Sequence, residues 1–66
     1  MNPFRIYYGY KSLYGYEDTT NAIQNILNDF FKEMSTLELK YRVISINQDL
    51  SDKNYVDIYI YYEILH

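Results

Sequence analysis

The chain has 66 residues, a formal net charge of −3 at pH 7, no cysteine, and a single histidine at its last position. This composition excludes disulfides and argues against a zinc site. The acidic balance gives no general attraction for nucleic acid or anionic lipid. No apolar run reaches the ~18 residues of a membrane helix, and the N-terminus does not resemble a signal peptide. We therefore expect one small domain without cofactor or metal, located in the cytoplasm (the host cytoplasm if the protein is viral).

The size of the chain predicts a partner subunit. A domain this small buries only about 60% of the surface that its unfolded form exposes, so its core is thin. Natural domains of this length usually gain stability from disulfides, a metal or a second subunit. Since the first two are excluded or disfavoured here, we expect a homo-oligomer, most simply a homodimer.

Residues Phe4–Tyr10 are rich in aromatic and β-branched side chains and predict a first strand, whose pairing stays open. Along such a strand Phe4, Ile6, Tyr8 and Tyr10 share one face, whereas Arg5, Tyr7 and Gly9 share the other. Residues 11–17 then read as a tyrosine-rich loop, with or without a short extra strand. Gly9 and Gly15 each lie between two tyrosines. Glycine in a strand pattern indicates a bulge, a turn or a close approach of another segment.

A helix is predicted over Thr19–Met34, with Asp18 or Thr19 as its N-cap and Asn21 with Gln24 as a weaker capping pair. Apolar residues recur there at spacings of three and four, which is the helical period. The stripe comprises Ile23, Leu27, Phe30, Met34 and Leu37, and is widened by Ile26 and Phe31.

The end of this helix is ambiguous between Met34 and Ile44. The helical spacing continues formally through Tyr41 and Ile44, but from Leu37 to Val43 apolar and charged residues alternate strictly. Strict alternation is the pattern of a half-buried strand. We therefore predict a strand over residues 36–47, with a β-bulge at Val43–Ile44 where the apolar positions change from odd to even.

The last part of the chain predicts a hairpin. Residues 48–54 form a turn region dense in Asp, Ser and Asn, and residues 55–65 form a second long strand. The even positions of that strand are mainly aliphatic and should lie under the helix. The predicted fold is α+β with the order β-α-β-β: a three-stranded sheet, at least partly antiparallel, with one amphipathic helix on one face.

Tyrosine supplies the main functional signal, since ten of the 66 residues are tyrosine and the sequence contains no catalytic triad, nucleotide-binding loop or metal-ligand set. We therefore predict a protein that is not an enzyme and that binds another protein. Tyrosine and arginine are enriched at protein interfaces. The predicted binding residues on the sheet face opposite the helix are Arg5, Tyr7, Arg42, Tyr55, Tyr59 and Tyr61. A second candidate is the tyrosine-rich loop, with Tyr10, Tyr14 and Tyr16.

Two other functions remain open at this point. Stacked tyrosines on an open sheet could bind a nucleotide or single-stranded nucleic acid, although few basic residues accompany them. The chain could also be a structural subunit of a larger assembly. In its size, acidity and lack of catalytic groups, the chain resembles small phage-encoded anti-defence inhibitors of the anti-CRISPR type. That resemblance implies binding and inhibition of a larger protein of a bacterial defence system.

Overall fold

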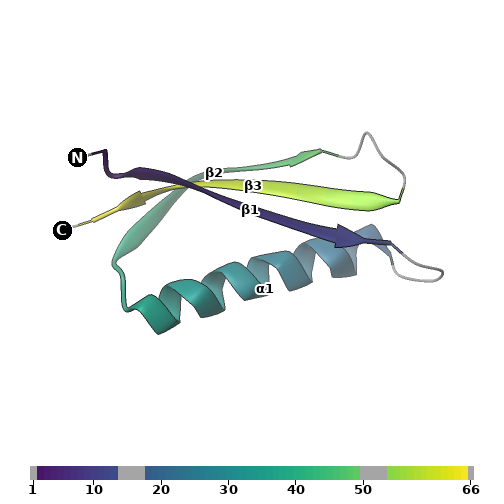
Figure 1. Cartoon of the computed structure of the whole chain (residues 1–66), viewed down its shortest axis with the longest axis horizontal. Coiled ribbons are helices and arrows are strands. Elements are labelled where there is room, and N and C mark those ends of the chain that lie inside the picture. The colour runs from purple at the N-terminus through teal and green to yellow at the C-terminus, as the bar shows by residue number, and fades with distance from the viewer. Residues whose placement is uncertain (1, 14–17, 50–53, 66) are drawn as a thin grey trace.

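The computed structural model describes residues 2–13, 18–49 and 54–65 of the chain (Figure 1). Its elements follow the order β1 (Phe4–Ser12), α1 (Thr19–Leu37), β2 (Tyr41–Asp49) and β3 (Tyr55–Ile64). Figure 1 shows the strands as one layer and α1 as a second layer along one side of the sheet. The predicted α+β fold with the order β-α-β-β is therefore confirmed.

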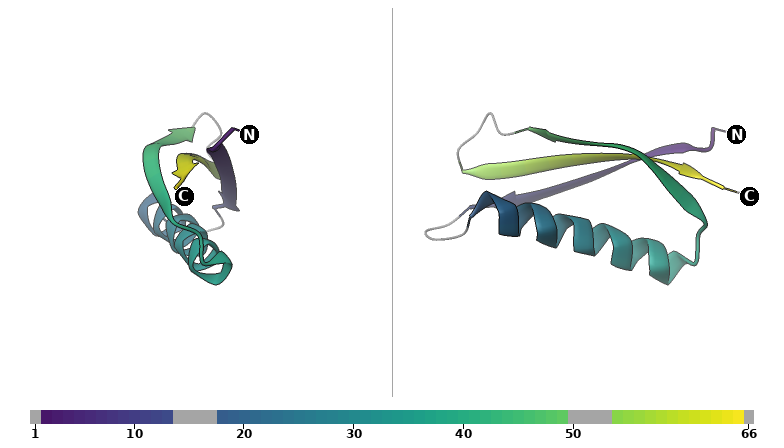
Figure 2. Two further views of the ribbon diagram at one scale, coloured as in Figure 1. Left: turned by 90° about the vertical axis from the view of Figure 1, so that its left-hand side faces the viewer. Right: turned by 180° about the vertical axis from the view of Figure 1, so that it is seen from behind.

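The sheet has the strand order β1-β3-β2, and β3 is antiparallel to both of its neighbours. The predicted hairpin of β2 and β3 is present, although residues 50–53 of its turn lie outside the described residues. Because β1 and β2 both oppose β3, they run parallel to each other, and α1 is the connection between them. Figure 2 shows the consequence: β1 and β2 form the two edges of the sheet and β3 lies between them.

The first strand is longer than the sequence indicates. Lys11 and Ser12 continue β1 and lie opposite Val56 and Tyr55 of β3, so the residues predicted as a loop begin with strand. The remainder of that predicted loop, residues 14–17, lies outside the described residues.

The helix begins where it was predicted. Asp18 is the N-cap, and its side-chain oxygen Oδ1 accepts a hydrogen bond of 2.7 Å from the backbone N–H of Asn21. This bond satisfies one of the N–H groups that a first helical turn leaves unpaired. The helix then runs to Leu37, three residues beyond the predicted segment.

The prediction of a strand from residue 36 is wrong, because the helix ends with a left-handed cap at Glu38 (φ 55°, ψ 33°). The N–H of Glu38 donates to the carbonyl oxygen of Ser35 at 3.2 Å. Thr36 still belongs to the helix, and its hydroxyl donates to the carbonyl oxygen of Lys32 at 2.9 Å instead of leaving the helical backbone. β2 consequently begins only at Tyr41 and continues to Asp49, beyond the predicted limit of Asn47.

The core lies between α1 and β3. Its buried members are Ala22, Ile26, Phe30 and Met34 of α1 and Val56, Ile58, Ile60 and Tyr62 of β3. The aliphatic positions of the last strand therefore face the helix as predicted. Phe30 is fully buried, and its ring makes edge-on contacts with those of Tyr7, Tyr41 and Tyr62 at centroid distances of 5.1, 5.7 and 5.4 Å. One aromatic side chain thus joins all three strands to the helix.

The buried stripe of α1 differs from the predicted stripe. Its four buried residues are spaced four apart, whereas Phe31 and Leu37 are 45% and 54% exposed. A row of residues spaced by four inclines across the helix surface instead of following the axis. The stripe that meets the sheet therefore shifts around the helix along its length, and Leu37 falls outside it.

The predicted bulge in β2 is confirmed. The register with β3 shifts between Val43 and Ser45, which leaves Ile44 as an extra residue. Val43 packs against the core, whereas Ile44 is 50% exposed. The bulge thus lets two successive aliphatic residues take different environments.

Candidate interaction surface

The side of the sheet turned away from α1, hereafter the open face, is the most distinctive surface of the described chain. Strand alternation and the cross-strand register define its membership. Its apolar and aromatic members are Phe4, Ile6, Tyr8, Tyr10, Ile44, Tyr55, Tyr59 and Tyr61. Each is between 37% and 63% exposed. A monomeric soluble protein rarely leaves so continuous an apolar surface without a role.

The tyrosines of the open face pack against each other. The ring of Tyr8 lies 5.0 Å from that of Tyr59 and is stacked on that of Tyr10 at 6.0 Å between centroids. The Tyr8 hydroxyl donates a 2.5 Å hydrogen bond to Asp57 Oδ1, and this bond is the main cause that raises the pKa of Tyr8 to about 12. The cluster is therefore ordered before any ligand binds, which lowers the entropy cost of binding.

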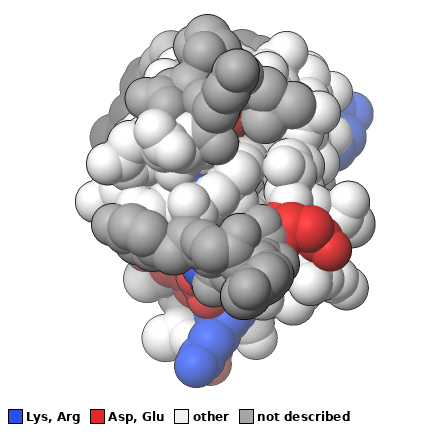
Figure 3. Space-filling model, turned by 90° about the vertical axis from the view of Figure 1, so that its right-hand side faces the viewer, with Lys and Arg blue, Asp and Glu red and all other residues white. Residues whose placement is uncertain are grey.

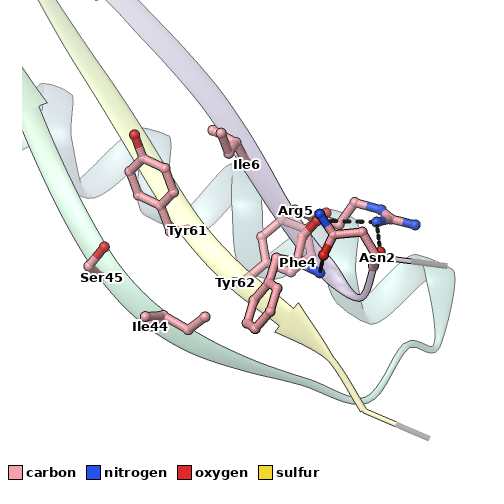
Figure 4. Close-up of a pocket in the computed structure, with 8 residues that line it drawn as sticks. All are labelled: Asn2, Phe4, Arg5, Ile6, Ile44, Ser45, Tyr61 and Tyr62. Carbon is pink, nitrogen blue, oxygen red and sulfur yellow. Dashed lines mark hydrogen bonds between the residues drawn. The ribbon is translucent and has the colours of Figure 1, made fainter.

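A hollow of about 400 Å³ lies at one end of the open face (Figure 4). Phe4 and Ile6 of β1 border it on one side, Ile44 and Ser45 of β2 border it on the other, and Tyr61 lies on the central strand. Because the bulge turns Ile44 toward this side, an irregularity in β2 contributes directly to the shape of the hollow. Its walls are mostly apolar, so it suits an apolar side chain of a partner.

The charges of the open face are largely compensated within the face. Arg42 forms an ion pair with Glu63 at 2.5 Å, and Asp57 accepts the hydrogen bond from Tyr8. Seen from the end at which α1 begins, the described surface is mostly uncharged, with separate acidic and basic spots (Figure 3). Because these charged groups are paired within the face, its described part offers aromatic contact more than a charged field.

The predicted binding residues divide into two groups. Tyr55, Tyr59 and Tyr61 lie on the open face as predicted, and so does Arg42, although its guanidinium is already paired with Glu63. Tyr10, predicted as the end of the first strand and grouped with the binding residues of the loop, lies in β1 on the same face and is 63% exposed. The other predicted loop residues, Tyr14 and Tyr16, lie outside the described residues.

The predicted placement of Tyr7 and Arg5 on the open face is wrong. Tyr7 packs on Phe30 beneath the sheet, and its pKa is raised by burial and by the neighbouring Glu33 and Asp29. Arg5 lies opposite Tyr62, a helix-side residue, and its guanidinium Nη1 donates to the carbonyl oxygens of Asn2 and Phe4.

Gly9 gives the physical reason for this reversal. A Cβ added at Gly9 would lie 2.5 Å from Cγ2 of Ile26, so the helix approaches the strand where the side chain is missing. Odd positions of β1 therefore face α1, and the larger even positions face outward. Gly9 was the signal in the sequence that could have indicated which side of β1 faces the helix, since a glycine in a strand can mark the close approach of another segment.

Phe4, Ile6, Tyr8 and Ile44 belong to the open face but were not predicted as binding residues. Phe4, Ile6 and Tyr8 were known from the sequence to share one face, but their apolar character favoured the core. Ile44 could be placed only through the bulge, because its side follows from the shift in register.

Within the described residues, no three His, Cys, Asp or Glu side chains gather where they could hold a metal ion. Among the same residues, no helix combines the length and apolar character needed to cross a membrane. No protein family, curated protein or solved structure matches the chain.

Proposed function

We propose that the protein is a non-catalytic interaction protein whose open face binds a larger protein. The observation that carries this proposal is the row of half-exposed aromatic and aliphatic side chains across all three strands. Exposed apolar patches bordered by polar groups are typical of protein-binding sites. Tyrosines with fixed rings give large contact areas at a small entropy cost.

The charges favour a protein partner over single-stranded nucleic acid. Among the residues that the structure describes, the basic group on the open face is Arg42, which is paired with Glu63, and Asp57 and Asp49 lie on the same side of the sheet. Nucleic-acid binding derives much of its affinity from basic side chains that neutralise phosphates. Carboxylates among the tyrosines would repel those phosphates, whereas a protein surface with its own apolar side chains would not be repelled.

A protein that binds through such a face covers part of its partner's surface and keeps other molecules from it. We therefore infer an inhibitory role, in which the bound protein blocks a functional surface of its target. The resemblance to small anti-defence inhibitors suggests a component of a bacterial defence system as that target. The geometry supports the mode of action, and the resemblance alone supports the target.

The proposal is tested by site-specific photo-crosslinking in a lysate of cells in which the protein is naturally made. The photoreactive amino acid p-benzoylphenylalanine replaces Tyr59 on the open face or, as a control, Asn28 on the exposed side of α1. We expect one dominant partner to be crosslinked from position 59 and not from position 28. Equal crosslinking from both positions, or none from position 59, would contradict the proposal.

Competition with unlabelled variants then tests the hollow. Tyr61→Thr removes an aromatic side chain that lines the hollow, and Phe31→Gln removes a similarly exposed ring from the helix. Since an anchoring aromatic residue commonly contributes more than about 1.4 kcal/mol to binding, we expect Tyr61→Thr to compete at least about tenfold less well than the unchanged protein. Phe31→Gln should compete as well as the unchanged protein.

A further inference from the structure

The outer edge of β1 presents backbone groups that the sheet does not use. The N–H of Leu13 donates to the carbonyl oxygen of Asn54 at 2.8 Å, and that of Ile64 donates to Pro3 at 2.9 Å. Odd-numbered residues of β1 therefore form the hydrogen-bonded pairs with β3. In an antiparallel ladder the intervening residues direct their N–H and C=O groups the other way. The outward groups of β1 thus belong to its even-numbered residues.

One end of this edge is capped within the chain. The N–H of Phe4 donates to Asn2 Oδ1 at 2.9 Å, and its carbonyl oxygen accepts from Arg5 Nη1 at 3.2 Å. Beyond Phe4, no described residue bonds the outward backbone groups of Ile6, Tyr8 and Tyr10. The same holds for Ser12, so within the described parts of the chain the free edge runs from Ile6 to Ser12. The opposite edge, β2, is interrupted by its bulge, which is a common protection against strand addition.

We propose that this free edge binds the same edge of a second copy, with antiparallel β1 strands related by a two-fold axis at Gly9. Gly9 is the midpoint of the segment from Ile6 to Ser12. In this register Tyr8 lies opposite Tyr10 of the second copy, and Ile6 lies opposite its Ser12. The outward groups of these residues then form about eight main-chain hydrogen bonds.

Charge complementarity supports this register. Lys11 lies on the helix side of β1 and forms no ion pair among the described residues. The register places it opposite Tyr7 of the second copy, and Tyr7 shares a shallow pocket of the helix flank with Asp29, Lys32 and Glu33. The two carboxylates outnumber the one ammonium group there, so each Lys11 meets a flank of net negative charge on the other copy.

The neighbouring register, centred on Tyr8, is disfavoured for two reasons. It would place Arg5 of one copy opposite Lys11 of the other, and like charges directly opposite each other destabilise a sheet. It would also need the N–H of Phe4, which already donates to Asn2 Oδ1. The Gly9-centred register avoids both costs.

Such a dimer joins the two sheets into one of six strands, with both helices on the same side. The open faces become one continuous aromatic surface, and the shared edge compensates for the thin core of a small chain. Figure 2 shows β1 at the margin of the sheet, with no described element beyond it. The inference is independent of the proposed function, because a monomer could still bind a larger protein through the open face.

The test is sedimentation equilibrium of the purified full chain over a range of concentrations. We expect the unchanged protein to approach twice the 8.1 kDa mass of one chain. Lys11→Glu should raise the dimer dissociation constant about tenfold or more, because it removes an interfacial charge pair and creates a repulsion. Adding Glu33→Lys should restore the affinity, whereas Lys40→Glu, the same charge change outside the strands, should leave it unaltered.

A second pair of variants tests the backbone bonds themselves. Tyr10→Pro and Tyr10→Thr both remove the exposed ring, but only proline also removes the outward N–H. We expect Tyr10→Thr to dimerise and Tyr10→Pro to remain monomeric. A monomeric unchanged protein, a dimer indifferent to Lys11→Glu, or equal dimerisation of the two Tyr10 variants would overturn the inference. None of these outcomes affects crosslinking from the open face, so the two proposals fail separately.

Discussion

The substitution Gly9→Ala tests how closely α1 packs on the sheet, because it adds one methyl group at the contact. Gly9→Ala adds a Cβ 2.5 Å from Cγ2 of Ile26, a side chain that is only 4% exposed. Alanine otherwise suits a strand better than glycine by about 0.5–1 kcal/mol. Overpacking a buried site costs about 1–3 kcal/mol, so after this gain we expect a net loss of up to about 2.5 kcal/mol in the free energy of unfolding.

The measurement is urea unfolding followed by circular dichroism, at a fixed chain concentration so that any self-association contributes equally. For a domain of this size the loss corresponds to a fall in melting temperature of roughly 4–8 °C per kcal/mol. As a control, Gly9→Ala is also made in a protein that carries Ile26→Leu. Leucine has no branch at Cβ, so it lacks the Cγ2 methyl group with which the added Cβ collides. Gly9→Ala should cost less in that background, with a coupling energy on the order of 1 kcal/mol.

The result that would refute this reasoning is a stabilisation by Gly9→Ala in the unchanged background. That result would mean that α1 does not approach β1 closely at this residue. The assignment of even-numbered β1 residues to the open face would then lose its main support. Equal effects of Gly9→Ala in both backgrounds would contradict the contact with Ile26 in the same way.

Three further predictions concern the core, the helix end and the tyrosine cluster. Phe30→Ala should lower the free energy of unfolding by about 3–5 kcal/mol, because the ring joins the helix to three strands, and denaturant unfolding should detect largely unfolded protein. Glu38→Gly should raise the melting temperature, because glycine adopts the left-handed conformation of this cap at about 0.5–1 kcal/mol less cost. Tyr8, whose pKa is raised to about 12 chiefly by its hydrogen bond to Asp57, should give a late step in the tyrosinate absorbance at high pH. Its raised pKa stabilises the fold fully below pH ~10, and this contribution is lost as the pH rises through about 12. Tyr8→Phe should abolish the late step in tyrosinate absorbance, and an unchanged titration would contradict the assignment.

The open face holds five of the ten tyrosines of the chain, namely Tyr8, Tyr10, Tyr55, Tyr59 and Tyr61. One helix covers one side of a three-stranded sheet, and the other side must remain in contact with water or with a partner. Tyrosine serves both conditions, because its ring packs on neighbouring strands while its hydroxyl bonds to water or to a carboxylate. The bond from Tyr8 to Asp57 is such a case within the chain.

The predictions from sequence succeeded where local periodicity determines structure. The helical repeat fixed α1 and its first residue, since a capping aspartate and an apolar stripe act within a few residues of each other. Alternation in β3 placed Val56, Ile58 and Ile60 under the helix. The change from odd to even apolar positions located the bulge beside Ile44.

The sequence by itself thus determined that there is one helix and three strands, and which side of β3 is buried, because each depends on neighbours within a few residues. Only the tertiary structure decided the order of the strands, the last residue of α1 and the side on which Tyr7 and Arg5 lie. The even positions of β1 are the more apolar ones, so its own pattern favoured burying them against the helix, and the structure places them on the other side. The contact between Gly9 and Ile26, residues far apart in sequence, decides it by allowing the helix to approach only one side.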